Sequence, residues 1–385
     1  MKTSAAKQSL LRLAGVLAAG LILTGCSSLN PFASDAAKPA ALVDFSPRAE
    51  LKLRWQAEVG EAGSAVFEPA VVGDSVYVAS GKGRLLRLDG GQQRWRADAG
   101  RELSAGVGAS HSIVVVVTRS GEALAYDADS GEERWRSKIG AEVLATPVVD
   151  GDLVVLRASD NRLIGLSARD GSQRWIYQRA NPPLALRNFA GVVIDEGVVL
   201  AGFPGGRLVV VDASNGAPIT ELPVSNPRGA TELERVADVV GLPVAGRREI
   251  CAVSYQGRAA CFDTGNGNVL WARDFSSSVG MDRDARYAVV TDESNAVHAL
   301  DVYSGSTVWV QDQLVRRAVT RPLIVDDYIA VGDLEGYVHL LDRDSGEFVA
   351  RVRADKEALV APPRAYGRGL IVQGLSGRVS VYDVR

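Results

Sequence analysis

The stretch "YDADSGEERW", from Tyr126 to Trp135, decides the fold because its pattern recurs along the chain. An Asp is followed four residues later by Gly and eight residues later by Trp. In turns, an Asp side chain accepts hydrogen bonds from backbone N–H groups, and Gly readily adopts the positive φ that a tight turn needs. The pattern therefore predicts a turn between two strands, after which the ring of Trp135 packs between neighbouring repeat units.

The chain contains eight such units, in each of which a short apolar strand leads to the Asp position. These positions are Asp89, Asp127, Ser167 (in place of Asp), Asp212, Asp263, Asp301, Asp342 and Asp383. The intervals between them are 38, 40, 45, 51, 38, 41 and 41 residues. A period of about 40–45 residues with four short strands is typical of propeller blades. We therefore expect an all-β fold, an eight-bladed β-propeller of four-stranded antiparallel blades.

The Trp residues predict how the ring closes. Five units carry the Trp, at Trp95, Trp135, Trp175, Trp271 and Trp309, and the fourth and seventh units have Thr220 and Ala350 there. Trp55 has no Asp–Gly turn before it, and the last unit ends at "YDVR" without a Trp. We expect the N-terminal strand, Leu51–Glu58, to complete the eighth blade, which begins near Pro362, because ring closure protects sheet edges.

The N-terminal segment has the features of a secretory signal. Three basic residues precede the short apolar run "LAGVLAAGLILTG", which is too short for a comfortable membrane span. The run ends in "LTGC", Leu23–Cys26, which resembles a bacterial lipobox. The resemblance implies removal of residues 1–25 and acylation of Cys26. The alternatives are an ordinary signal peptide with a chance Cys and an uncleaved anchor.

The residues after Cys26 bear on where the protein is held. Residues 26–50 are rich in Ser, Ala and Pro, which is typical of a flexible tether, so residues 51–385 form the single propeller domain. Acyl chains hold a protein on a membrane in proportion to their buried CH₂ groups. Ser27 follows Cys26, whereas an Asp there would resemble an inner-membrane retention signal. We expect a lipid anchor at the periplasmic face of the outer membrane.

The charge of the predicted mature chain argues against nucleic acid as a partner. Without residues 1–25, 40 basic and 46 acidic residues remain, and the formal net charge is −6. Binding to nucleic acid needs a basic surface.

Two cysteines, Cys251 and Cys261, flank a predicted hairpin, "AVSYQGRAA". A turn centred on Gln256 places them opposite each other, whereas a two-residue turn at Gln256-Gly257 misaligns them by one residue. In an oxidising compartment the pair could form a disulfide, and the alternative is two small buried residues in adjacent strands.

The repeated Asp–Gly–Trp pattern resembles the tryptophan-docking motif of PQQ-dependent quinoprotein dehydrogenases, which are also eight-bladed. The resemblance does not extend to chemistry, because no Ca²⁺ site of carboxylate and amide side chains can be assigned, and the cysteines are not adjacent. His111, His298 and His339 lack metal-ligand spacing, and there is no nucleophile elbow or phosphate loop. We expect no catalytic residue, metal or cofactor. A quinoprotein enzyme and a periplasmic ligand-binding lipoprotein remain the alternatives.

The lipobox, the tether and the compact propeller together resemble the BamB family, lipoproteins of the outer-membrane β-barrel assembly machinery (the Bam complex). The stretches that carry the resemblance include "PPLALRNFAGVVIDEGVVLAGFPGGRLVVVDASNG", "ATELERVADV", "GDLEGYVHLLDRDSG" and "GLSGRVSVYDVR". The resemblance implies a non-enzymatic scaffold that docks on the periplasmic POTRA domains of BamA. It also implies work beside the other Bam lipoproteins and help in handing over unfolded outer-membrane proteins.

The family's Leu-x-Leu-Arg docking loop matches Leu184, Leu186 and Arg187. Exposed Leu side chains beside an Arg would suit a protein interface. The alternative is a connecting loop that tucks its Leu residues inward.

A second docking loop of the family carries Asp-x-Asp, and here Asp238 is present but Val240 stands at the second place. This departure weakens or shifts the second contact. Glu234 and Arg235, just upstream, could contribute, or could simply form a solvated charge pair. Both loops fall in the two longest intervals, of 45 and 51 residues, as expected for a partner site on a propeller face.

Overall fold

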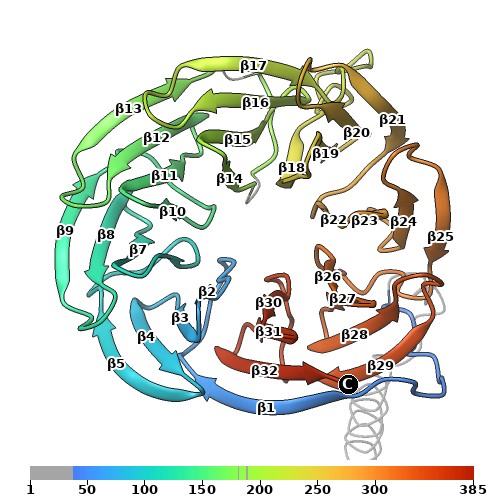
Figure 1. Cartoon of the computed structure of the whole chain (residues 1–385), viewed down its shortest axis with the longest axis horizontal. Helices are drawn as coiled ribbons and strands as arrows, with labels where there is room; N and C mark the ends of the chain where they lie inside the picture. The colour runs from blue at the N-terminus through green and yellow to red at the C-terminus, as the bar shows by residue number, and fades with distance from the viewer. Residues whose placement is uncertain (1–37, 181, 188–189) are drawn as a thin grey trace, which may run out of the picture. The chain divides into compact units, whose positions relative to one another are not determined.

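The eight sheets of the computed structural model each contain four antiparallel strands (Figure 1). The structure describes residues 38–180, 182–187 and 190–385, and in these it has no helix, so no helical segment there could cross a membrane. The predicted signal, Cys26 and the first part of the tether lie outside the described residues. The expectation of an all-β, eight-bladed propeller is confirmed.

Each blade runs from an innermost to an outermost strand, and the blades follow one another in chain order. The first four blades are β2 (Ala70–Val72), β3 (Ser75–Ala79), β4 (Arg84–Asp89), β5 (Gln92–Asp98); β6 (Gly108–Ala109), β7 (Ile113–Val117), β8 (Glu122–Asp127), β9 (Glu133–Lys138); β10 (Val148–Asp150), β11 (Leu153–Arg157), β12 (Arg162–Ser167), β13 (Gln173–Gln178); and β14 (Val192–Asp195), β15 (Val198–Phe203), β16 (Arg207–Asp212), β17 (Pro218–Pro223). The last four are β18 (Val239–Ala245), β19 (Glu249–Ser254), β20 (Gly257–Asp263), β21 (Val269–Phe275); β22 (Met281–Arg283), β23 (Tyr287–Thr291), β24 (Val297–Asp301), β25 (Thr307–Gln311); β26 (Leu323–Val325), β27 (Tyr328–Gly332), β28 (Tyr337–Asp342), β29 (Phe348–Arg353); and β30 (Arg364–Tyr366), β31 (Gly369–Gln373), β32 (Arg378–Val384) with β1 (Leu51–Glu58).

The ring closes as the Trp pattern predicts. Strand β1 pairs antiparallel with β32, so that Leu51 lies opposite Val384 and Glu58 lies opposite Arg378. In Figure 1 the blue N-terminal strand lies outside the red C-terminal strands and completes their sheet. The first and last strands of the propeller therefore belong to one blade.

The repeated Trp joins the first, second, third, fifth and sixth blades each to the next blade. The indole N–H of Trp135 donates to the carbonyl of Ala168 in the third blade at 3.0 Å. The ring lies over Gly171, where a Cβ would come within 2.4 Å of it. The Gly of the pattern therefore has two roles, because it takes a φ of +71° and leaves room for the ring of the preceding blade. The same bond is made by Trp95 to Ala128, Trp175 to Ala213, Trp271 to Val302 and Trp309 to Arg343.

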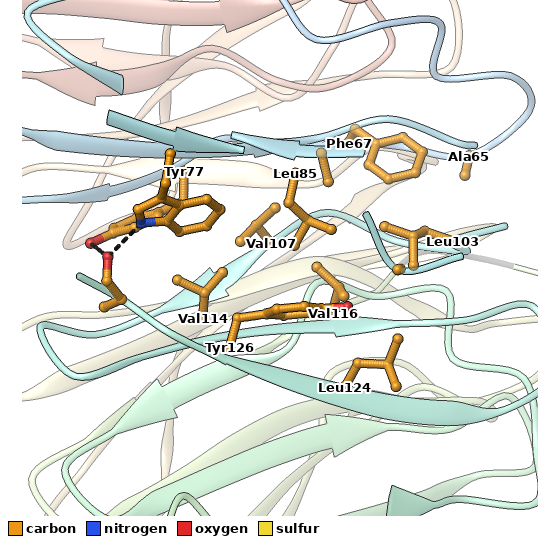
Figure 2. Packing of buried hydrophobic residues seen from close by; sticks show 14 of the residues in the cluster. Ala65, Phe67, Tyr77, Leu85, Leu103, Val107, Val114, Val116, Leu124 and Tyr126 are labelled. Atoms are coloured by element: carbon orange, nitrogen blue, oxygen red, sulfur yellow. Dashed lines mark hydrogen bonds between the residues drawn. The ribbon is translucent and has the colours of Figure 1, made fainter. Parts of the chain in front are cut away.

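The hydrophobic cores lie between neighbouring blades. Figure 2 shows one of them, where Phe67, Tyr77 and Leu85 from the first blade face Val114 and Tyr126 of the second. All of these side chains are almost fully buried. Each blade thus packs both of its faces, and burial of apolar area at every blade interface stabilises the whole ring.

The Asp of the pattern caps its turn as expected. The Oδ1 atom of Asp127 accepts hydrogen bonds from the N–H groups of Ser130 at 2.8 Å and Asp129 at 2.9 Å. The bond from Ser130, together with the Arg134 side chain, lowers the pKa of Asp127 to about 2. The Ser214 and Ser304 side chains lower the pKa of the equivalent Asp212 and Asp301 in the same way.

These turns predict acid sensitivity. A carboxyl group whose pKa is lower in the folded state stabilises the fold above its unfolded pKa, and this contribution is lost as pH falls through the folded pKa. We expect the free energy of unfolding to fall between about pH 4 and pH 2. Urea unfolding measured across this range should give a smaller fall for Asp127→Asn than for the wild type. The exposed Asp74→Asn is the control, and equal falls in all three proteins would contradict the assignment.

Residues 40–50, which we expected to belong to the flexible tether, are packed against the seventh blade. We call them the strap. The N–H of Ala40 donates to the carbonyl of Val315 at 3.0 Å, and that of Arg48 donates to Val349 at 3.0 Å. The ring of Phe45 stacks on Phe348, with the centroids 5.7 Å apart. The packed body therefore begins at Ala40, not at residue 51, which corrects the boundary of the tether.

A buried polar network holds the strap. Arg317 donates through Nε to Asp333 at 2.7 Å and through Nη1 to the carbonyl of Ala40 at 2.7 Å. The Nε2 atom of His339 lies 2.9 Å from Asp333, and its Nδ1 accepts from Arg351 at 3.1 Å. Burial lowers the pKa of His339, which favours the neutral ring, with Nε2–H donating to Asp333.

His298 and His339 serve the fold, since each is held by an Asp of its own blade. His298 on β24 and His339 on β28 each contact an Asp, at 2.8 Å and 2.9 Å. Across residues 38–180, 182–187 and 190–385, no three His, Cys, Asp or Glu side chains lie together as a metal site would need.

Candidate docking surface

The loop at residues 182–187 connects the third and fourth blades, and the structure separates the three residues of its Leu-x-Leu-Arg motif. The side chain of Leu184 is exposed, at 48 % of its area, and Arg187 projects into solvent with 65 % exposure. Leu186 instead is partly buried and packs against the core cluster between the fifth and sixth blades. One Leu of the motif therefore faces solvent and the other is tucked inward, and the docking role of the loop stays a prediction.

Asp238 supports this loop from inside the protein. It is 1 % exposed, and its Oδ2 accepts from the N–H of Leu186 at 2.6 Å while Oδ1 accepts from Gly205 at 3.4 Å. Burial raises the pKa of Asp238, and these two bonds together with Arg157 oppose the rise. Val240, at the place of the family's second Asp, is buried too. Asp238 therefore positions the loop and does not reach the surface.

Glu234 and Arg235 lie in an exposed turn between β17 and β18. Glu234 accepts from the N–H of Thr231 at 3.1 Å, while its own N–H donates to the Thr231 hydroxyl at 3.3 Å, a reciprocal cap. The bond from the Thr231 N–H lowers the pKa of Glu234. Arg235 donates to the carbonyl of Gly229 at 3.0 Å. Both side chains therefore brace the turn.

The same turn presents a residue that sequence reasoning missed. Leu233 is 69 % exposed, the most of any large hydrophobic residue described. Its signal in the sequence is a single Leu within the polar stretch "ATELERV". The turn and the loop at 182–187 both lead from an outermost strand to the next innermost strand, so they lie on the same face of the propeller.

A cavity of about 370 Å³ lies beside the loop, with Pro182, Leu186, Arg187 and Arg157 among its lining residues. Arg187 pairs with Glu142 at 2.7 Å. Arg157 is buried and its guanidinium lies 3.8 Å from the centroid of the Phe203 ring. Burial lowers the pKa of Arg157 to about 10. Exposed Leu and Arg side chains around a cavity are suited to binding a partner.

The cysteine pair lies in the core that supports the loop. Cys251 on β19 is directly opposite Cys261 on β20, and the structure joins them by a disulfide with their Cα atoms 4.0 Å apart. Gln256 lies at the centre of the turn with a φ of +46°, so the first of the two expected turns is the one observed. Leu186 packs against the cluster that contains both cysteines.

Removing the Asp238 carboxylate should loosen the loop. Asp238→Ala leaves the buried N–H of Leu186 without its acceptor, and we expect a loss of about 1–3 kcal/mol in stability. Limited proteolysis should cleave the variant faster within residues 182–187. The exposed Asp195→Ala, at the end of β14 in the fourth blade, is the control. Equal cleavage rates of the two variants would contradict the supporting role.

The sequence of the chain is similar to a known protein family and to characterised relatives. The family model described as outer membrane protein assembly factor BamB matches residues 86–311. Outer membrane protein assembly factor BamB of Pseudomonas aeruginosa is 44 % identical over 377 residues, which cover 97 % of this chain and 98 % of the relative. The protein of the same name from Bordetella pertussis is 40 % identical over 372 residues, 96 % of each chain.

Solved structures with a similar fold include a BamB protein and an enzyme. The crystal structure of BamB from Moraxella catarrhalis superposes with a TM-score of 0.81 at 27 % identity, and the match covers 87 % of this chain and 100 % of that one. A quinohemoprotein alcohol dehydrogenase from Comamonas testosteroni reaches a TM-score of 0.68 at 12 % identity, over 86 % of this chain and 76 % of the dehydrogenase. This second likeness extends to the propeller alone.

Proposed function

Since the chain belongs to the family of the outer membrane protein assembly factor BamB, we propose that it serves the Bam complex by docking through one face of its propeller. Membership makes it a non-enzymatic factor of outer membrane protein assembly. The proposed docking surface consists of Leu184 and Arg187, with Leu233 on the same face. The proposed partner is the set of periplasmic POTRA domains of BamA, beside the other lipoproteins of the complex.

One observation carries this proposal. Leu184 and Arg187 are exposed on a loop whose backbone is fixed from inside by Asp238. A preorganised loop loses little conformational freedom on binding, so more of the contact energy remains as affinity. Apolar side chains and Arg are enriched at the centres of protein interfaces. Glu234 and Arg235 support the neighbouring turn and would lie at the rim.

The anchor is the second part of the proposal. Acylation of Cys26 would hold the protein on the periplasmic face of the outer membrane, a location that agrees with the outer-membrane role of the named relatives. Cys26 is outside the described residues, so the lipobox sequence alone supports the modification. The strap then leads from the anchor into the propeller.

Delivery of unfolded outer-membrane proteins is the third part. The outermost strand of each blade has one edge without a strand partner, and β25 also exposes Val308 and Val310. An extended segment of an unfolded protein could add to such an edge by β-augmentation. Peptides from outer-membrane proteins should therefore be retained by the immobilised propeller. If none is retained, the proposed role in delivery is contradicted.

The docking test compares matched variants of the chain from residue 27 to 385. Binding to the POTRA fragment of BamA from the same organism is measured for Leu184→Ala/Arg187→Ala. We expect affinity to fall at least about thirtyfold, because loss of a central anchor typically costs about 2 kcal/mol or more. Leu186 is left intact, since it packs in the core.

The control is Leu270→Ala/Arg94→Ala, which removes a Leu of 45 % exposure and an Arg of 61 % exposure from outermost strands. Both double variants should melt at the wild-type temperature. Equal affinities for the two variants would contradict the proposed docking surface.

A further inference from the structure

The second cavity lies on the axis of the ring and has no assigned role. Its volume is about 580 Å³, which is in the usual range for a small-molecule site. Residues from all eight blades line it, in or just before the innermost strands. Most of its walls are apolar, and Val107, Val149, Val193 and Ile194 are examples.

The charged residues that line the cavity are one acid and three arginines. Glu68 is paired with Arg364 at 3.3 Å, and Arg187 is paired with Glu142 at 2.7 Å. Arg321 is the exception. It is only 9 % exposed, yet within the described part of the chain no hydrogen bond or ion pair is found for its guanidinium. The cavity therefore carries an uncompensated positive charge in a chain whose formal net charge is −3.

The fold holds Arg321 in place. The preceding residue, Thr320, accepts at its hydroxyl from the N–H of Gly332 at 2.9 Å and at its carbonyl from the Thr291 hydroxyl at 3.0 Å. The Arg321 stem passes Gly280, where a Cβ would lie 3.3 Å from Arg321 Cδ. The glycine leaves room for the stem, so the arginine projects into the cavity from a fixed backbone.

Arg321 is 9 % exposed, and its guanidinium nitrogens are not among the fully buried polar atoms without a partner, so they are reached only from the cavity. A cation in so confined a volume is less well hydrated than one on the open surface, and no side chain of the described residues compensates its charge. An anion in the cavity would restore the missing hydrogen bonds, and a guanidinium can bind a carboxylate through two parallel N–H···O bonds. The apolar walls would be covered by an apolar body on the same molecule. We propose that the axial cavity binds an organic anion, with a carboxylate or sulfonate on Arg321 and an apolar body against the valine walls.

This proposal does not depend on the docking surface, and it can be tested without a partner protein. Anilinonaphthalene sulfonate, which has both an anionic group and an apolar body, is titrated into the folded mature chain, and its fluorescence is followed. Octanoate is the competitor of matched chemistry. Octanol supplies the apolar body alone and acetate supplies the charge alone. We expect octanoate to displace the dye at a concentration at least about tenfold lower than either of these, because a hydrogen bond to a charged group contributes about 1.5–3 kcal/mol.

Variants assign the site. Arg321→Met should weaken binding of the dye and of octanoate at least about tenfold. Arg368→Met, at a fully solvated arginine with 95 % exposure, is the control and should bind as the wild type does. Glu68→Gln should act in the opposite direction, because it frees Arg364 and removes the only acid of the lining, and we expect binding about twofold or more tighter.

Two results would overturn the proposal. One is octanol displacing the dye as well as octanoate does. The other is a folded Arg321→Met that binds with wild-type affinity. If Arg321→Met does not fold, the Glu68→Gln variant decides, and unchanged octanoate binding there overturns the proposal.

Discussion

Replacing Trp175 by alanine is expected to lower the free energy of unfolding by about 3–5 kcal/mol, the usual range for a buried Trp or Phe truncated to Ala. Its ring lies between Gly165 of its own blade and Gly216 of the next, where added Cβ atoms would come within 2.2 Å and 2.6 Å of it. Its indole N–H donates to Ala213 at 2.9 Å. The substitution therefore opens a cavity at a blade interface and removes the bond that joins the two blades. Urea unfolding followed by circular dichroism measures the loss.

A matched pair of substitutions separates the hydrogen bond from the packing. Trp175→Phe keeps a ring but removes the bond to Ala213, whereas the indole nitrogen of Trp55 is buried without a partner. Trp175→Phe should therefore cost about 1 kcal/mol more than Trp55→Phe. If Trp55→Phe lowers the free energy of unfolding more than Trp175→Phe does, the hydrogen bond between blades is not the main contribution of the repeated Trp to stability.

The second large effect is expected at Asp333. Asp333→Ala leaves His339 without its acceptor and leaves Arg317 with Glu335 as its one remaining carboxylate partner. Breaking a buried ion pair by removing one partner typically costs about 3–5 kcal/mol, and we expect the lower end of that range because Glu335 remains. Because Arg317 also holds Ala40, the strap should open at the same time. Unfolding in urea gives the stability, and hydrogen exchange at the amides of Ala40, Arg48 and Ala49 gives the opening.

Asp327→Ala is the matched control, since this Asp lies in the same blade, is 83 % exposed and pairs with Arg343 at 3.1 Å. It should change stability by less than about 1 kcal/mol. Wild-type exchange rates in the strap of Asp333→Ala would show that Phe45 and its stacking on Phe348 hold the strap without the network.

The ring and its closure could be predicted because they depend on a pattern repeated in one chain. The turn at Gln256 could not be chosen in advance, because the Gly that follows it suggests a two-residue turn. In the structure Gln256 takes the positive φ, and Gly257 is required for space, since a Cβ there would lie 2.2 Å from Ser254 Oγ. Local sequence does not distinguish a glycine used for its φ from one used for close packing.

The candidate site was only partly predictable, for a similar reason. The motif identified Leu184 and Arg187, but the inward turn of Leu186 toward the buried Asp238 depends on a bond between residues 52 positions apart. The strap was missed because its contacts are more distant still, as in the bond from Arg351 to Val43, 308 positions away. A segment of Ser, Ala and Pro looks like a linker until Val43 and Phe45 are seen to pack against the core between the sixth and seventh blades.

The pairing of β1 with β32 also sets an order of events. A blade made from both ends of the chain cannot be finished while the C-terminal residues are still being synthesised or exported. Until then the first and seventh blades each lack a neighbour, and their apolar faces and strand edges are open to other chains. Closing the ring joins residues more than 300 positions apart, and such distant contacts are slow to form. The newly made protein therefore passes through an interval in which it needs the same protection from aggregation as the barrel proteins whose assembly it serves.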